Sequence, residues 1–242
     1  MSVSTRVSIA WAPDFVPTEN TSTLVLTGRR YFVDQRVFLP LARDSTDAEA
    51  STSKVDWAFA GTREAQAATG SDVGWTHSRW THLVDSRSED PSPDEGLLKS
   101  PYDGDESLTE EKGEMVNPKT VKVTRHREIW KDFEVPTGTR VCFWERPDGR
   151  GSRGSNAPAM VGVVGNDAVA VGRDGAGKEA WTWRRRRRDG RSWELVFEEP
   201  RGASKKGEGL LGRTEAATEG EAEVVDGEIW VVREAWSTPD SI

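Results

Sequence analysis

The stretch Val161-Gly-Val-Val-Gly-Asn-Asp-Ala-Val-Ala-Val171 decides the fold, because two strand-forming runs flank the turn pair Gly165-Asn166. Gly and Asn adopt positive φ at little cost, and two-residue turns of this kind match the right-handed twist of paired strands. Asp-Gly pairs at 189–190 and 226–227 lie in the same way inside residues 181–197 and 223–233. The sequence therefore predicts consecutive antiparallel hairpins, and a meander of hairpins avoids exposed edges by curling into a barrel.

The first half contains further runs with the composition of strands. Residues 55–62 alternate, with Val55, Trp57 and Phe59 on one face, which is typical of a strand with one bulky buried face. Residues 63–69 are expected to form a turn of helix that ends at Gly70. The remaining predicted strands of this half are residues 6–11, 23–27, 31–39, 75–86 and 121–134.

The chain of 242 residues is long enough for two small β domains. Pro136-Thr137-Gly138 interrupts the strand pattern, so we place a boundary there and expect one barrel in residues 1–136 and a second in residues 137–242. The tripeptide Glu-Ile-Trp occurs at 128–130 and again at 228–230, near the end of each half. This repeat supports two related barrels, with coincidence as the alternative.

Residues 87–120 contain four prolines and almost no apolar periodicity. Between Asp85 and Glu114 there are eleven acidic residues and three basic ones, so this stretch accounts for the whole net charge of −8. Such a segment buries too little apolar surface to offset its ordering entropy. We therefore expect a mobile acidic insertion at residues 87–120 of the first barrel, and the global charge gives no argument about partners.

The single cysteine, Cys142, excludes an intramolecular disulfide and suits a reducing compartment. Residues 1–11 lack the apolar run of a secretory signal, and no segment has the length of a membrane span. We expect a cytoplasmic protein that can also enter the nucleus. The arginine run 184–188 is expected to form a hairpin tip with alternate side chains on opposite faces, so no nucleic-acid partner is predicted; contact with the acidic segment is a competing hypothesis.

The motif Trp57-Ala-Phe-Ala-Gly-Thr62, followed by Arg127-Glu-Ile-Trp130, resembles the fungal HRI protein family. Both motifs lie in the first half, so the resemblance directly covers about residues 1–135 and extends to the second half only through its hairpin pattern and length. It implies tandem lipocalin-like, calycin-type β-barrels without an established enzymatic activity. The family name records an interaction with a yeast casein kinase I, so the resemblance also implies a kinase of that type as a partner.

An antiparallel barrel either packs solid or leaves a cavity for one small ligand. The chain has eleven Trp against two Tyr, and indoles suit both a packed core and the wall of a pocket. Two interpretations follow: a filled core, or a flat apolar ligand bound among the indoles. In the second, the candidate ligand-binding residues are Trp57, Phe59, Trp75, His77, Trp80, Trp130, Trp181 and Trp183.

The common spacings of catalytic and metal sites are absent from the sequence. His77 and His82 face opposite sides of a regular strand, and no Cys-x-x-Cys or His-x-x-x-His pattern occurs, so no metal site is expected. There is no Gly-x-Ser-x-Gly, and Cys142 lies in an apolar run, so no catalytic nucleophile is predicted. No cofactor is predicted either, although one histidine is all that a haem-binding barrel needs.

These features predict an all-β protein that acts as a non-enzymatic interaction or regulatory protein, with a casein kinase I-type kinase as its implied partner. The first alternative is a carrier that binds a small apolar ligand. The second alternative is a calycin-type cyclase or isomerase, which would need an inward-facing acid or base such as Asp56, His77 or Glu128.

Overall fold

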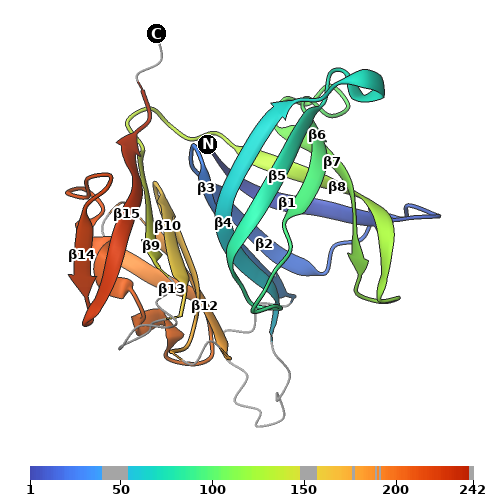
Figure 1. Ribbon diagram of the computed structural model, residues 1–242. Helices are drawn as coiled ribbons and strands as arrows, with labels where there is room; N and C mark the ends of the chain where they lie inside the picture. Colours follow the sequence, from blue (N-terminus) through green and yellow to red (C-terminus); the bar gives the residue numbers. More distant parts are fainter. Residues whose placement is uncertain (40–53, 148–156, 176–177, 189, 191, 240–242) are drawn as a thin grey trace.

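The computed structural model describes residues 1–39, 54–147, 157–175, 178–188, 190 and 192–239, and its fold is all-β, as the sequence predicts. The first eight strands form a closed antiparallel barrel, in which each strand pairs with the next and β8 pairs back with β1 (Figure 1). These strands are β1 (Ser2–Trp11), β2 (Thr21–Thr27), β3 (Tyr31–Phe38), β4 (Val55–Ala67), β5 (Thr76–Asp85), β6 (Asp94–Lys99), β7 (Leu108–Asn117) and β8 (Lys122–Phe133). A single-turn 3₁₀ helix, η1 (Gly70–Asp72), lies between β4 and β5.

Residues 87–120 form part of the barrel wall, so the prediction of a mobile insertion is wrong. Strands β6 and β7 fall inside this segment and connect β5 to β8 through continuous ladders. Thr109 and Glu111 of β7 face a polar barrel interior, so the segment lacks the apolar alternation that identifies a strand from sequence. The predicted helical turn at 63–69 is also wrong, because β4 continues to Ala67 in register with β5.

The second half forms a seven-stranded antiparallel sheet in the described part of the chain, and not the second closed barrel that the sequence predicts. The strand order is β13-β12-β11-β10-β9-β15-β14. The strands are β9 (Arg140–Arg146), β10 (Ala159–Val164), β11 (Asp167–Arg173), β12 (Ala180–Arg188), β13 (Ser192–Glu199), β14 (Ala222–Val225) and β15 (Glu228–Ser237). The three hairpins predicted from the Gly-Asn and Asp-Gly pairs are confirmed as β10–β11, β12–β13 and β14–β15.

The connection between β13 and β14 explains why this sheet buries its tryptophans without closing. It contains two short 3₁₀ helices, η2 (Ala203–Lys205) and η3 (Glu208–Arg213). Leu210 and Leu211 of η3 pack in one core cluster with four tryptophans of the sheet: Trp144, Trp181, Trp183 and Trp230. The segment therefore covers the sheet face that a closed barrel would have enclosed.

The other face of the second sheet packs against the outside of the barrel (Figure 1). On the barrel side, Leu24 and Leu26 of β2 and the alanines 58 and 60 of β4 are buried in this interface. On the sheet side they contact a cluster that includes Phe143 and Met160. Strand β4 is consequently buried on both faces, with small residues under the sheet and bulky ones inside the barrel.

Polar side chains also connect the halves at this apolar interface, and Glu234 and Arg184 make several of these hydrogen bonds. The Glu234 carboxylate of β15 accepts hydrogen bonds from the backbone N–H groups of Arg29, Arg30 and Tyr31 in the β2–β3 turn, at 2.8, 2.6 and 2.9 Å. Arg184 of β12 is buried and donates to Gln35 of β3 and to residue 22 of β2. Strands β2 and β3 of the barrel therefore hold Arg184. The competing hypothesis, contact of the arginine run with the acidic segment, does not describe this residue.

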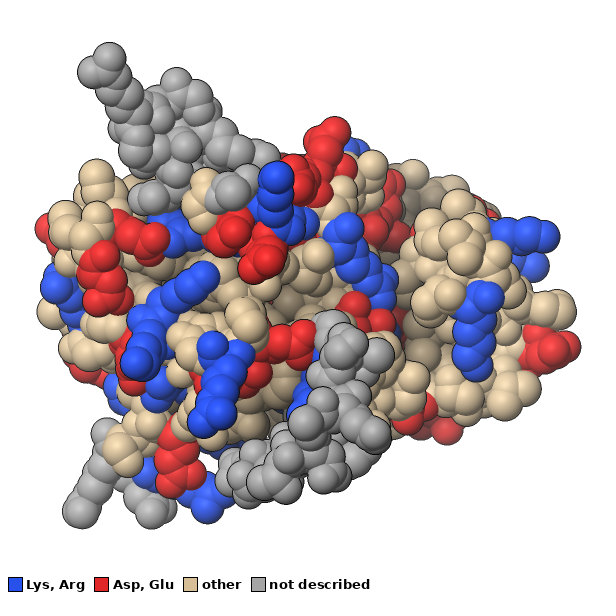
Figure 2. Space-filling view, turned by 90° about the horizontal axis from the view of Figure 1, so that it is seen from below, with Lys and Arg blue, Asp and Glu red and all other residues tan. Residues whose placement is uncertain are grey.

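The described surface carries charges of both signs. On the face shown in Figure 2, basic and acidic side chains intermingle over the barrel and the second sheet. In the described residues, no helix combines the length and the apolar character that crossing a lipid bilayer requires.

Candidate functional site

The barrel encloses a cavity of about 460 Å³. Its rim includes Met1 and Phe133, which are both about half exposed. Aromatic side chains form one part of the wall, and these are Phe32, Trp57, Phe59, Trp80 and Trp130. Charged and hydroxyl side chains form most of the rest, together with the aliphatic Val25, Leu98 and Met115, so the barrel interior is more polar than the interface on its outer face.

The structure brings together half of the residues that the sequence predicted for a ligand site. Trp57, Phe59, Trp80 and Trp130 all line the cavity. Trp75 and His77 do not: the ammonium of Lys112 lies 4.1 Å from the Trp75 ring, and His77 contacts Glu95 with a partly exposed side chain. Trp181 and Trp183 lie in the separate core of the second sheet.

Two arginines lie deep in the barrel and are held by carboxylates. Arg36 of β3 donates to Asp34 at 2.8 Å, and its guanidinium lies within 6 Å of the rings of Trp57, Phe59 and Trp130. Burial opposes the charge of Arg36, but the neighbouring carboxylates outweigh burial and raise its pKa above the ordinary value. Arg36 is therefore a fixed internal cation, stabilised by an ion pair and by aromatic faces.

Arg6 of β1 connects two further carboxylates in the same region. Its Nη1 donates to Glu128 Oε1 at 2.8 Å, and its Nε donates to Glu19 Oε2 at 2.6 Å. Arg36 also lies near Glu128, with 3.7 Å between Nη1 and Oε1. Both Arg6 and Glu128 are almost fully buried, so this pairing fixes the orientation of the Glu128 carboxylate.

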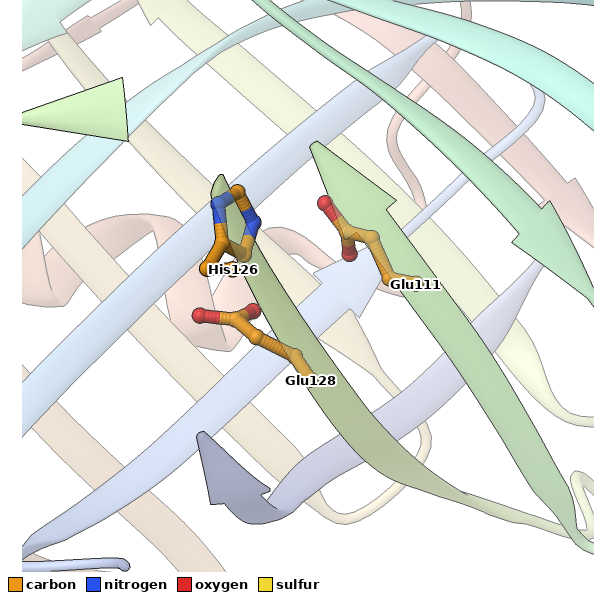
Figure 3. A group of neighbouring side chains, drawn as sticks. All are labelled: Glu111, His126 and Glu128. Carbon is orange, nitrogen blue, oxygen red and sulfur yellow. The ribbon is translucent and has the colours of Figure 1, made fainter. Parts of the chain in front are cut away.

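Glu111, His126 and Glu128 form a cluster beside these arginines. Glu111 belongs to β7, whereas His126 and Glu128 are two residues apart on β8 and therefore share its inner face. Figure 3 shows the His126 ring next to both carboxylates, and one potential ligand atom from each residue lies within 4.8 Å of the others. Two glycines of paired strands give this cluster room, because a Cβ atom would lie 2.8 Å from Glu111 Oε1 at Gly96 and 3.0 Å from the His126 ring at Gly113.

The environment of this cluster favours uncharged forms of two of its members. Burial, followed by the nearby charge of Glu128, raises the pKa of Glu111 to about 8. Burial lowers the pKa of His126, so its imidazole is neutral at pH 7. The cavity thus contains a carboxyl group that retains its proton near neutrality and a neutral histidine with a free nitrogen lone pair.

A family model described as Protein HRI1 matches residues 2–234. The chain belongs to the HRI1 family. The resemblance inferred from the Trp57–Thr62 motif is therefore confirmed, and the family match covers both halves of the chain.

One solved structure shares the fold of this HRI1 family member. It is described as the crystal structure of uncharacterized protein YLR301w from Saccharomyces cerevisiae, with a TM-score of 0.72 and 16% sequence identity. The match covers 97% of this chain and 98% of the other, so it includes the barrel and the second sheet. No curated protein matches the chain.

Sequence reasoning missed the Glu111–His126–Glu128 cluster of the HRI1 chain. Cys-x-x-Cys and His-x-x-x-His are spacings typical of zinc ribbons and helices, whereas the relevant signal on a strand is His-x-Glu, with both side chains on one face. Glu111 lies within residues 87–120, which the sequence predicts to be an insertion and not a strand. Of the three acids or bases proposed for an enzyme, Glu128 lines the cavity, but Asp56 and His77 do not.

His82 of the HRI1 barrel predicts a pH dependence of stability. Its Nδ1 lies 2.8 Å from Asp85 Oδ2 and its Nε2 lies 3.5 Å from Asp94 Oδ2, while its ring stacks on Phe59. Burial alone would lower its pKa, but the two carboxylates outweigh burial and raise the pKa to about 9. Because an unfolded His titrates near ~6.5, protonation of His82 stabilises the fold fully below about pH 6.5, and this contribution is lost as pH rises through 9.

We expect the free energy of unfolding to fall by about 2 kcal/mol more between pH 6.5 and 9 in the natural chain than in a His82→Gln variant. Urea denaturation followed by tryptophan fluorescence at several pH values measures this difference. Parallel pH profiles for the two proteins, or a natural chain that gains stability toward pH 9, would contradict the role assigned to His82.

Proposed function

We propose that the barrel of this HRI1 family member binds a small organic molecule with a flat apolar part and a positively charged or hydrogen-bond-donating group. The observation that supports this function is the cavity, which combines an aromatic wall with a surplus of carboxylates. Ligand binding, which the sequence offers as the first alternative, thereby becomes the leading proposal for the function. The proposed ligand is more polar than the one that the sequence predicts.

The size and the apolar part of the cavity suit one small molecule. A volume of about 460 Å³ lies within the range of ordinary small-molecule sites, which is roughly 300–1,000 Å³. Trp80 is only partly buried, whereas Trp57 and Trp130 are both buried and lie beside Arg36. A flat ring entering past Met1 and Phe133 would therefore contact Trp80 first.

The charge of the lining selects the polar group of the ligand. Two arginines, Arg36 and Arg63, line the cavity, and Arg36 is already paired with Asp34. The acidic lining residues are more numerous: Asp34, Asp94, Glu95, Glu111, Glu114, Glu128 and Asp132. Because like charges repel in an enclosed site, an amine fits this lining better than a carboxylate.

The test compares aromatic amines with aromatic carboxylates of equal size, such as 1-naphthylmethylamine and 1-naphthoate, in calorimetric titrations. We expect the amines to bind with one molecule per chain, and the carboxylates to bind at least about tenfold more weakly. A Trp80→Ala variant should weaken amine binding by about tenfold or more, because an aromatic contact is removed.

The matched control is Trp75→Ala, since Trp75 lies outside the cavity and should leave the amine affinity unchanged. If the carboxylates bind as tightly as the amines, or if both variants weaken binding equally, the proposal is wrong. The association with a casein kinase I-type kinase is a separate prediction that rests on the family resemblance alone.

A further inference from the structure

We propose that Glu111, His126 and Glu128 bind a divalent transition-metal ion within the barrel cavity. This site goes beyond the binding of an organic ligand, because it uses only side chains of β7 and β8. Each of the three residues supplies one atom of a kind that metals accept, and these atoms lie within 4.8 Å of one another. Two oxygens and one imidazole nitrogen at that spacing can converge on a single ion with only rotamer adjustments.

The position of the three ligands is set by regular structure. Glu111 and Glu128 are direct cross-strand partners in the β7–β8 ladder, and His126 is opposite Gly113 in the same ladder. Their backbones are therefore held by the barrel hydrogen bonds and not by a loop. The glycines 96 and 113 leave the space that Glu111 and His126 occupy, as the close approach of a Cβ atom at either position indicates.

The carboxylates around the site outnumber the buried cations by two. The buried cations are Arg6 and Arg36, and the carboxylates that surround them are Glu19, Asp34, Glu111 and Glu128. A divalent ion between Glu111 and Glu128 would displace the proton of Glu111. With all four carboxylates then ionised, this group has two negative charges in excess, and the ion would compensate both.

His126 provides an independent indication of a missing partner. The residue is only 5% exposed, and its Nδ1 is buried without a hydrogen-bond partner in the described part of the chain. Buried polar atoms are nearly always paired, so an unpaired imidazole nitrogen beside two carboxylates points to a bound species. In the described part of the chain, Arg6 donates its hydrogen bond to Oε1 of Glu128 and not to Oε2, so Oε2 remains available to a ligand. The same hydrogen bond orients the carboxylate from outside the site.

The donor set selects the class of metal. An imidazole with two carboxylates suits Zn²⁺, Mn²⁺, Fe²⁺ or Co²⁺, whereas Mg²⁺ and Ca²⁺ prefer oxygen ligands alone. Three protein ligands leave at least one coordination position of a tetrahedral ion open. Because all three residues line the cavity, this position would face the enclosed space, where water or the donor atom of a ligand could occupy it.

The experiment titrates chelator-treated protein, without any organic ligand, with Zn²⁺ by calorimetry and with Co²⁺ by electronic absorption. We expect one Zn²⁺ per chain, a Co²⁺ spectrum of low coordination number, and no comparable binding of Mg²⁺ or Ca²⁺. Glu111→Gln and His126→Gln should each weaken Zn²⁺ binding by more than about 100-fold, because even outer-shell changes cost roughly 10–100-fold.

The matched control is His77→Gln, since His77 does not line the cavity and its partly exposed side chain contacts Glu95, so this variant should leave Zn²⁺ affinity unchanged. Glu111→Gln also separates binding from folding, because a neutral amide replaces a carboxyl group that keeps its proton near neutrality, so the variant should not lower the melting temperature. Zn²⁺ that binds equally well to Glu111→Gln and to His126→Gln, or that is lost from His77→Gln instead, would overturn the proposal. Organic-ligand binding is measured in metal-free protein, so either proposal can fail without the other.

Discussion

A Gly61→Ala variant is expected to lose about 3 kcal/mol or more of its free energy of unfolding. A Cβ atom at position 61 would lie 1.9 Å from the carbonyl oxygen of Thr81 and 2.9 Å from the backbone nitrogen of Leu83. Both atoms belong to the backbone of β5, so no side-chain rotation relieves the overlap. Strands β4 and β5 shift register between Ala60 and Gly61, and the close approach of the two backbones occurs at this bulge.

Urea denaturation monitored by circular dichroism measures this loss, and Gly175→Ala is the matched control. Among the described residues, no atom lies within 4 Å of a Cβ added at position 175, so this variant should stay within about 0.5 kcal/mol of the natural chain. A Gly61→Ala protein as stable as Gly175→Ala would show that the bulge can open at little cost. Because Gly61 belongs to the Trp57–Thr62 motif, the result also tests why this motif contains a glycine.

A Glu234→Ala variant is expected to lose about 3 kcal/mol, because it leaves three backbone N–H groups of the β2–β3 turn without their acceptor. The Glu234 carboxylate also accepts from the Trp236 indole at 3.1 Å and is only 4% exposed. A register shift in β15 between Val232 and Glu234 accompanies this contact with the barrel. The loss should come from weaker docking of the second sheet onto the barrel.

Thermal and urea unfolding of Glu234→Ala, compared with Glu219→Ala, measures this effect. Glu219 is exposed, so its variant should change stability by no more than about 0.5 kcal/mol. Glu234→Gln retains one acceptor oxygen and should fall between the natural chain and Glu234→Ala. Equal stabilities of Glu234→Ala and Glu219→Ala would contradict the role of this carboxylate at the interface.

The failure to predict β6 and β7 has a physical cause in the barrel interior. Sequence patterns identify a half-buried strand by alternating apolar and polar residues, and this pattern holds for β4, where Trp57 and Phe59 face inward. In β7 the inward positions carry Thr109 and Glu111, so both faces of the strand are polar. Strands that line a polar cavity therefore lack the apolar periodicity by which a strand is identified from sequence.

The candidate site was predictable in its aromatic part and not in its charged part. Alternation within one strand was enough to place Trp57 and Phe59 on a common inner face. The ion pairs of Arg6 with Glu128, and the approach of Glu111 to His126, join residues of different strands. Such pairs depend on the register between strands, which a single sequence without an alignment does not specify.

By itself, the sequence determined the hairpins and the all-β class, because turn residues that accept positive φ and the alternation of residues within a strand are patterns of a few neighbouring positions. The motif that indicated the family is equally local. The tertiary structure alone decided that the first eight strands close into a barrel and that the next seven remain a sheet packed on it. Closure depends on the pairing of β8 with β1, more than a hundred residues apart in the chain, and on which face of the second sheet residues 200–219 cover. These contacts depend on the shape and burial of the whole assembly, so no local pattern encodes them.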